Sequence, residues 1–252
     1  MPKLLIAAIV GTVAGIASGL FGIGGGLVIV PSLVLILGFD QHRAHATSSA
    51  AVVLTATAGA IRFFHGGAAD LRAGVLLAGG AMLGALTGAT LMGKVSSKWL
   101  KGLFISVAAI AAVRLAIGGF GSGIGVDRIE ATTGVFVGIV LLGLATGTLV
   151  SMLGLGGGLV YVPILALVFG LEQHIAQGTS LVAIVPTAAI ATIVHLRARR
   201  VEIPIALVLG AGGIIGVLLG ALIAFSLPGS TLQLLFAGLL IAAAGLQLFK
   251  KR

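Results

Sequence analysis

The residues best suited to bind an anion lie in a glycine-rich motif that the sequence contains twice. The first glycine motif, Gly22–Pro31, reads GIGGGLVIVP, and the second glycine motif, Gly154–Pro163, reads GLGGGLVYVP. A glycine triplet interrupts a helix and leaves backbone N–H groups without side-chain cover. Where it leads into a new helix, these N–H groups and the helix dipole favour an anion. The predicted anion-binding residues of the two motifs are Gly24, Gly25, Gly26 and Pro31, and Gly156, Gly157, Gly158 and Pro163.

A pair of hydroxyl residues follows each glycine motif and extends the predicted site. These pairs, Thr47-Ser48 and Thr179-Ser180, lie near the start of the next apolar segment. Their hydroxyls could cap that helix, or donate hydrogen bonds to a bound oxyanion without a buried countercharge, which is costly in lipid. For one copy alone, glycine packing and helix capping would be the preferred interpretation. Two copies in register favour a substrate site instead.

Histidine and acidic residues recur at fixed positions outside the apolar segments. His42 and His174 each follow a glutamine, and they are candidates for proton coupling, with solvated loop residues as the alternative. Four acidic residues immediately before apolar segments predict helix capping: Asp40, Asp70, Glu172 and Glu202. Because no Asp or Glu lies inside an apolar segment, a cation carrier built on buried carboxylates is disfavoured.

The sequence lacks the motifs of metal sites, cofactor sites and enzymes. It has no cysteine and no histidine cluster with metal-ligand spacing. It also has no Walker loop and no nucleophile elbow. We therefore predict no metal, no cofactor and no enzymatic activity.

Composition identifies the elements that must position these residues as membrane helices. The chain has 252 residues, of which 59% are hydrophobic and 8% charged, too few charges for a water-facing surface. Two segments, 27–37 and 159–169, have 11 residues and reach only ~16 Å as helices, about half of a bilayer core. We predict an all-α transmembrane bundle of about ten segments: 4–21, 27–37, 44–61, 73–93, 102–120, 131–152, 159–169, 176–194, 203–227 and 232–249.

The two glycine motifs belong to an internal repeat with an offset of 132 residues. We expect a single membrane domain with repeat one at 1–118, a connector at 119–130 and repeat two at 131–252. If the short segments cross, each repeat has five crossings and the repeats are inverted; if they are re-entrant, each has four and the repeats are parallel. Either scheme places eleven of the 15 Lys and Arg residues on the side of both termini, which indicates a cytoplasmic location for the termini. This clustering accounts for the net charge of +9, so we predict no nucleic-acid partner.

These motifs resemble those of the sulfite exporter TauE/SafE family, also called TSUP transporters. The resemblance rests on GxGGG with Pro31, then Ala44-x-x-Thr47-Ser48, and on the same pattern in repeat two, ending in Gly178-Thr179-Ser180. Repeat one departs from the pattern at Ala46, where the family usually has glycine. The resemblance covers nearly the whole chain.

The resemblance implies a transporter in a prokaryotic inner membrane that carries a sulfur-containing anion such as sulfite, a sulfonate or thiosulfate. We expect alternating access, in which the small anion is held by the glycine motifs and the Thr-Ser pairs. The alternatives are an anion channel, which the same residues could form, and a membrane assembly factor without transport. The choice of anion, the direction, the coupling ion and the oligomeric state stay open.

Overall fold

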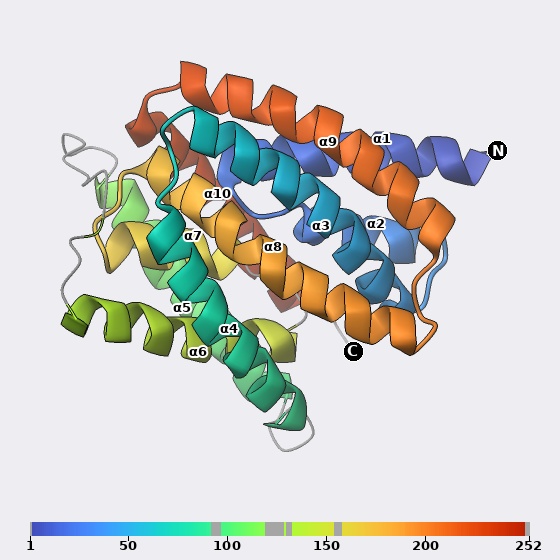
Figure 1. Ribbon diagram of the computed structural model, residues 1–252, viewed down its shortest axis with the longest axis horizontal. Helices are drawn as coiled ribbons and strands as arrows, with labels where there is room; N and C mark the ends of the chain where they lie inside the picture. The colour runs from blue at the N-terminus through green and yellow to red at the C-terminus, as the bar shows by residue number, and fades with distance from the viewer. Residues whose placement is uncertain (1, 92–96, 119–128, 130–132, 154–157, 250–252) are drawn as a thin grey trace.

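The computed structural model describes residues 2–91, 97–118, 129, 133–153 and 158–249, and ten α-helices form this part of the chain (Figure 1). They confirm the predicted all-α fold, and the two short segments are the ten-residue helices α2 and α7. The helices are α1 Pro2–Phe21, α2 Gly26–Leu35, α3 Gln41–His65, α4 Leu71–Leu91, α5 Ser97–Gly118, α6 Thr133–Leu153, α7 Gly158–Leu167, α8 Gln173–Arg197, α9 Ile203–Ser226 and α10 Gly229–Phe249. Among the described residues, four stretches are long and apolar enough to cross a membrane: 3–21, 41–65, 173–197 and 203–226.

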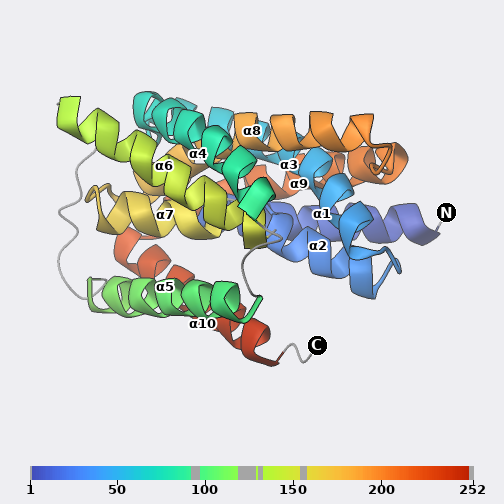
Figure 2. The same cartoon turned by 90° about the horizontal axis from the view of Figure 1, so that it is seen from below.

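Six helices form a row in which the two repeats alternate. Neighbours in the row are in contact, in the order α1, α9, α3, α8, α4, α6. An offset of 132 residues converts α1 into α6, α9 into α4 and α3 into α8, so the order reads the same from either end. Helices α5 and α10 pair on the far side, and the short α7 lies between them and the row (Figure 2). In this row, every helix therefore packs against helices of the other repeat.

Glycines allow the closest helix contacts in this row. Three glycines of α1 are four residues apart and pack on the backbone of successive turns of α9: Gly11 on Leu209, Gly15 on Gly213 and Gly19 on Val217. A Cβ at any of them would overlap that backbone. In the equivalent pair, Gly80 and Gly84 of α4 pack on Val140 and Leu144 of α6. Since both residue numbers rise together, each pair is parallel.

The direction of the helices shows that the repeats are inverted. Helix α3 also runs parallel to α9, because Thr47 contacts Glu202 and the later residue Gly59 contacts the later residue Val217. Helices α1 and α3 therefore run the same way, and α2 returns the chain to the side where α1 begins. Against its repeat equivalent α8, however, α3 is antiparallel. Gly59 packs on Leu181, while Phe63, one turn later, packs on the earlier residue Gly178. The five-segment scheme is the one that the fold adopts.

Helix capping by acidic residues is confirmed at two of the four predicted positions. Asp40 accepts a hydrogen bond from the Arg43 N–H, which holds the pKa of its carboxyl below the ordinary value. Asp70 accepts one from the Ala73 N–H at 3.1 Å. The prediction is wrong for Glu172 and Glu202, whose side chains do not cap their helices. Their carboxylates pair instead with His174 and Arg43, respectively.

Candidate functional site

The first glycine motif joins α1 to α2 through backbone angles that favour glycine. Gly22, Gly24 and Gly25 have φ values of 69°, 75° and 85°, in the left-handed region where other residues are strained. All residues from 22 to 26 are buried. Helix α1 ends at Phe21 and α2 begins at Gly26, so the predicted helix interruption is present.

This interruption lies at the middle of the long helices. A Cβ at Gly24 would contact Ile184 and Val52, which are the twelfth of the 25 residues of α8 and α3, respectively. A Cβ at Gly25 would contact Ala14, near the middle of α1. If the long helices cross the bilayer, the glycines are near its centre.

The first glycine motif contacts the start of the short helix of repeat two. Gly158, the first residue of α7, packs on the backbone of Gly22 and Ile23, and any Cβ at this position would overlap the Ile23 Cα. Gly156 and Gly157 of the second motif lie outside the described residues. The structure thus brings together the first motif and Gly158 from the two repeats.

Hydrogen-bond donors are available at the start of α2. The Val28 and Ile29 N–H groups donate to the Gly25 carbonyl, each at 3.1 Å. For the preceding N–H groups, of Gly26 and Leu27, no acceptor is found in the described part of the chain. The Ser48 hydroxyl would lie 3.7 Å from a Cβ at Gly26, and it has no hydrogen-bond partner among the described residues. Two backbone donors and one hydroxyl therefore lie around the N-terminus of α2.

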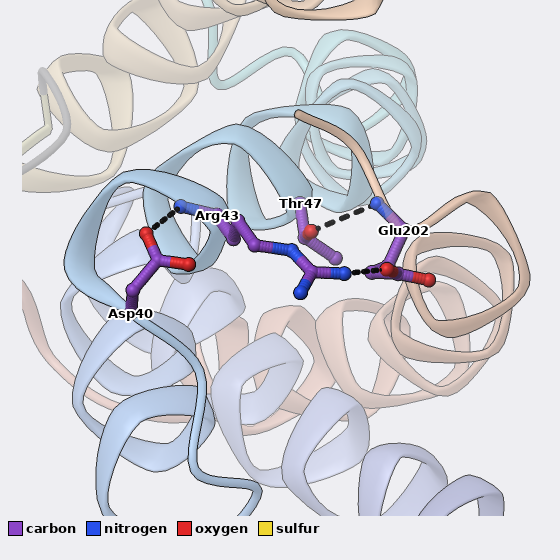
Figure 3. A network of polar contacts seen from close by, with 4 residues as sticks. All are labelled: Asp40, Arg43, Thr47 and Glu202. Atoms are coloured by element: carbon purple, nitrogen blue, oxygen red, sulfur yellow. Dashed lines mark hydrogen bonds and ion pairs between the residues drawn. The ribbon is translucent and has the colours of Figure 1, made fainter. Parts of the chain in front are cut away.

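The two threonines join the repeats to one another rather than opening their own helices. Thr47 and Thr179 are each the seventh residue of a 25-residue helix, so the prediction that they stand at helix starts is wrong. The Thr47 Oγ1 accepts a hydrogen bond from the Glu202 N–H at 3.1 Å (Figure 3). In the reciprocal contact, the Thr179 Oγ1 accepts one from the Asp70 N–H at 2.9 Å. Each threonine thereby caps the start of a helix in the other repeat.

Two side chains of α8 hold the first glycine motif in place. Ser180 donates a hydrogen bond to the Gly22 carbonyl at 2.9 Å, and the Gln177 amide donates to the Leu20 carbonyl at 2.8 Å. The sequence had singled out Ser180 but not Gln177. Its signal was present: Gln177 lies one turn after Gln173 in an otherwise apolar segment.

The two prolines of the motifs are not equivalent in the structure. Pro31 is exposed on the surface of α2, whereas Pro163 in α7 is buried. The structure therefore does not bring Pro31 to the residues around Gly24.

The two histidines also differ. His42 is exposed at the start of α3, whereas His174 is half-buried. The His174 Nδ1 lies 2.6 Å from a Glu172 carboxylate oxygen, its Nε2 donates to the Ala224 carbonyl at 3.1 Å, and its ring stacks on Phe225. The hydrogen bond with His174 holds the pKa of the Glu172 carboxyl below its ordinary value, although burial acts in the opposite direction. The interpretation as a solvated loop residue is wrong for His174.

Two pockets open at opposite ends of the long helices α3 and α9. A pocket of about 700 Å³ is lined by residues at the ends of α3 and α9 and the start of α8: Gly66, Gly67, Ala68, Ala69, Glu172, His174, Ile175 and Phe225. We call it the Glu172 pocket. A pocket of about 550 Å³, the Glu202 pocket, is lined at the starts of α1, α3 and α9 by Lys3, Leu37, Gly38, Phe39, Asp40, Arg43, Glu202 and Ile205. The offset of 132 residues relates Asp40 to Glu172, so the pockets occupy equivalent places in the inverted repeats.

The two pockets differ in their charged groups. In the Glu202 pocket, the Arg43 guanidinium forms an ion pair with the Glu202 carboxylate (Figure 3). The guanidinium also lies over the Phe39 ring, 5.5 Å from the ring centroid. The position equivalent to Arg43 in the Glu172 pocket is Ile175, and that pocket has the Glu172–His174 pair instead. In the described part of the chain, no group of three or more His, Asp or Glu side chains could hold a metal ion.

Comparison with known proteins gives one family and a set of bacterial relatives. The family model described as "Sulfite exporter TauE/SafE" matches residues 1–115 and 139–252. A "Probable membrane transporter protein" of Xylella fastidiosa (strain 9a5c) is 29% identical over 237 residues, 93% of this chain and 90% of that protein. "Probable membrane transporter protein YunE" of Bacillus subtilis (strain 168) is 25% identical over 265 residues, 95% of each. A "Probable membrane transporter protein" of Haemophilus influenzae is 30% identical over 169 residues, 64% of this chain and 62% of that protein.

Proposed function

The chain belongs to the sulfite exporter TauE/SafE family of membrane transporters, and from this premise we propose that it carries a small sulfur-containing oxyanion by alternating access. The substrate class is sulfite, a sulfonate or thiosulfate. The transporter is a secondary one, located in a prokaryotic inner membrane with both termini on the cytoplasmic side.

One observation carries this proposal: the first glycine motif, which contacts Gly158, leads into α2 near the middle of the long helices, and donors at the start of α2 lack acceptors among the described residues. We assign the anion to the N-terminus of α2, where it accepts from the Gly26 and Leu27 N–H groups and from the Ser48 hydroxyl. Neutral donors and a helix N-terminus stabilise an anion without a buried countercharge. The conformations of Gly24 and Gly25 present these N–H groups. Gly156 and Gly157, the sequence equivalents of Gly24 and Gly25, stay predicted anion-binding residues of repeat two.

The hydroxyls that already have backbone partners position the site. Ser180 holds the Gly22 carbonyl, and Thr47 and Thr179 cap helices of the opposite repeat. Substitution at these three residues acts on the anion through the backbone. Pro31 and Pro163 shape the short helices.

The inverted repeats and the two pockets support alternating access. The pockets occupy equivalent places at opposite ends of α3 and α9, as expected for two vestibules that serve one central site in turn. Coupling to protons would use His174, which faces the Glu172 pocket with its carboxylate partner, rather than the exposed His42. A flux that is unchanged by an imposed pH gradient would exclude this coupling.

Flux in proteoliposomes tests the site. Ser48→Ala removes one donor to a charged ligand, and we expect kcat/KM for oxyanion uptake to fall roughly tenfold. The matched control is Ser49→Ala, because the Ser49 hydroxyl donates to the His45 carbonyl of its own helix and lies one residue away. The panel of anions is hydrogensulfite, thiosulfate, sulfate, methanesulfonate and acetate.

The outcomes separate the alternatives. Equal flux in the Ser48→Ala and wild-type proteins would show that the site is wrong. Large conductance that rises linearly with concentration, without counterflow, would indicate a channel. A folded protein that transports none of the panel would favour an assembly role.

A further inference from the structure

Two glutamines on one face of α8 are buried with polar atoms that lack partners. Gln173 and Gln177 are one helical turn apart, and both are fully buried. The Gln177 Nε2 donates to Leu20, but its Oε1 has no partner, nor does either polar atom of the Gln173 amide, among the described residues. The buried Ser18 hydroxyl at the end of α1 is also unpartnered there. Because unpaired polar groups are costly to bury, such a cluster points to a polar ligand.

This cluster lies between the Glu172 pocket and the first glycine motif. Gln173 stands between Glu172 and His174, which line the pocket. Gln177 is at the other end, where Gly22 packs on its backbone. Ser18 is one turn before Gly22, whose N–H donates to the Ser18 carbonyl at 2.7 Å. The unpaired atoms therefore extend from behind the pocket toward the anion site.

The chemistry of the unpaired atoms restricts the ligand. The Gln173 amide nitrogen and the Ser18 hydroxyl can donate, whereas the carbonyl oxygens of Gln173 and Gln177 can only accept. A fully deprotonated oxyanion offers acceptors alone and would face these two oxygens without a hydrogen to share. An oxyanion that keeps one O–H satisfies both kinds of atom, and its single charge needs no buried cation.

We propose that Gln173, Gln177 and Ser18 form an entry subsite that takes the oxyanion in its protonated, singly charged form. The subsite connects the Glu172 pocket to the first glycine motif, and this inference rests on the proposed transport function. Among the described residues, only repeat two has this pair of buried glutamines. The positions equivalent to the glutamines hold Gln41 and His45, which are partly or fully exposed and bonded to each other at 3.1 Å.

The test compares two singly charged ions in proteoliposomes at mildly acidic pH. Hydrogensulfite has an O–H, and methanesulfonate has none. We expect the wild-type protein to prefer hydrogensulfite, and Gln173→Leu to reduce that preference roughly tenfold, as expected for the loss of a hydrogen bond to a charged ligand. Gln41→Leu, at the equivalent exposed position, is the matched control. An unchanged preference in Gln173→Leu would overturn the proposal and leave the amides with bound water only.

Thermal stability gives a second, transport-independent readout. Since Gln173→Leu removes an unpaired buried amide, we expect the melting temperature of the ligand-free protein to stay equal or rise. Hydrogensulfite should raise the melting temperature of the wild-type and Gln41→Leu proteins but not that of Gln173→Leu. If the wild-type protein transports neither ion, the proposed transport function is wrong. The change in melting temperature on adding hydrogensulfite still tests whether the subsite binds this ion. Equal shifts in all three proteins, or none in the wild type, would overturn it.

Discussion

The reciprocal threonine contacts make a quantitative prediction about how the repeats are joined. In Thr179→Val, the methyl group that replaces the hydroxyl cannot accept from the Asp70 N–H. This N–H is buried with Asp70, which is 8% exposed, so water cannot replace the lost acceptor. Leaving a buried donor unpaired costs about 1–3 kcal/mol, which lowers the ratio of folded to unfolded protein at least fivefold.

The equivalent variant of repeat one should be milder. In Thr47→Val, the affected N–H belongs to Glu202, which is only partly buried, and we expect a loss of about 1 kcal/mol or less. The two contacts lie near opposite ends of α3, so the losses should add within about 0.5 kcal/mol in the double variant. A larger sum would mean that the ends are coupled.

The assay is reversible unfolding in detergent micelles, followed by helical circular dichroism. Thr187→Val is the matched control in the same helix, because the Thr187 hydroxyl donates only to carbonyls of its own helix, at Ala183 and Ile184. We expect this control to change the free energy of unfolding by less than about 0.5 kcal/mol. If Thr179→Val is no more destabilising than Thr187→Val, the threonines do not join the repeats and our interpretation of the contact is wrong.

Two further predictions concern the glycine contact and the Glu172 pocket. Gly158→Ala places a methyl group against the Ile23 backbone and should lower the melting temperature and abolish flux. The control Gly79→Ala places its methyl group in open space beside α4, and we expect it to be neutral or stabilising by up to about 1 kcal/mol. Equal melting temperatures and fluxes in the two variants would contradict the contact between Gly158 and Ile23. Because the folded pKa of Glu172 lies below its ordinary value of 4.5, its contribution to stability is complete above that value and is lost as pH falls through the folded pKa. Melting curves from pH 7 to pH 3 should therefore fall less steeply for Glu172→Gln, and parallel curves would show that the carboxylate contributes nothing.

The sequence alone determined the membrane class, the ten helices and the repeat. These properties depend on local composition: each helix needs a long apolar run, and a glycine triplet interrupts a helix whatever surrounds it. The same reasoning located the short helices α2 and α7 and the capping residues Asp40 and Asp70, because a cap interacts with its own first turn. The resemblance to the TauE/SafE family rested on the same local motifs, and the family match confirms it.

Tertiary structure decided how the repeats face each other, and with it the role of each polar residue. The charge count could not distinguish parallel from inverted repeats, because both schemes place eleven of the 15 cations on the side of the termini. The antiparallel packing of α3 on α8 shows that the repeats are inverted. Thr47 and Thr179 looked like residues of their own helix starts, but their partners lie in the other repeat. Each of these outcomes depends on contacts between residues more than 100 positions apart, which local spacing does not specify.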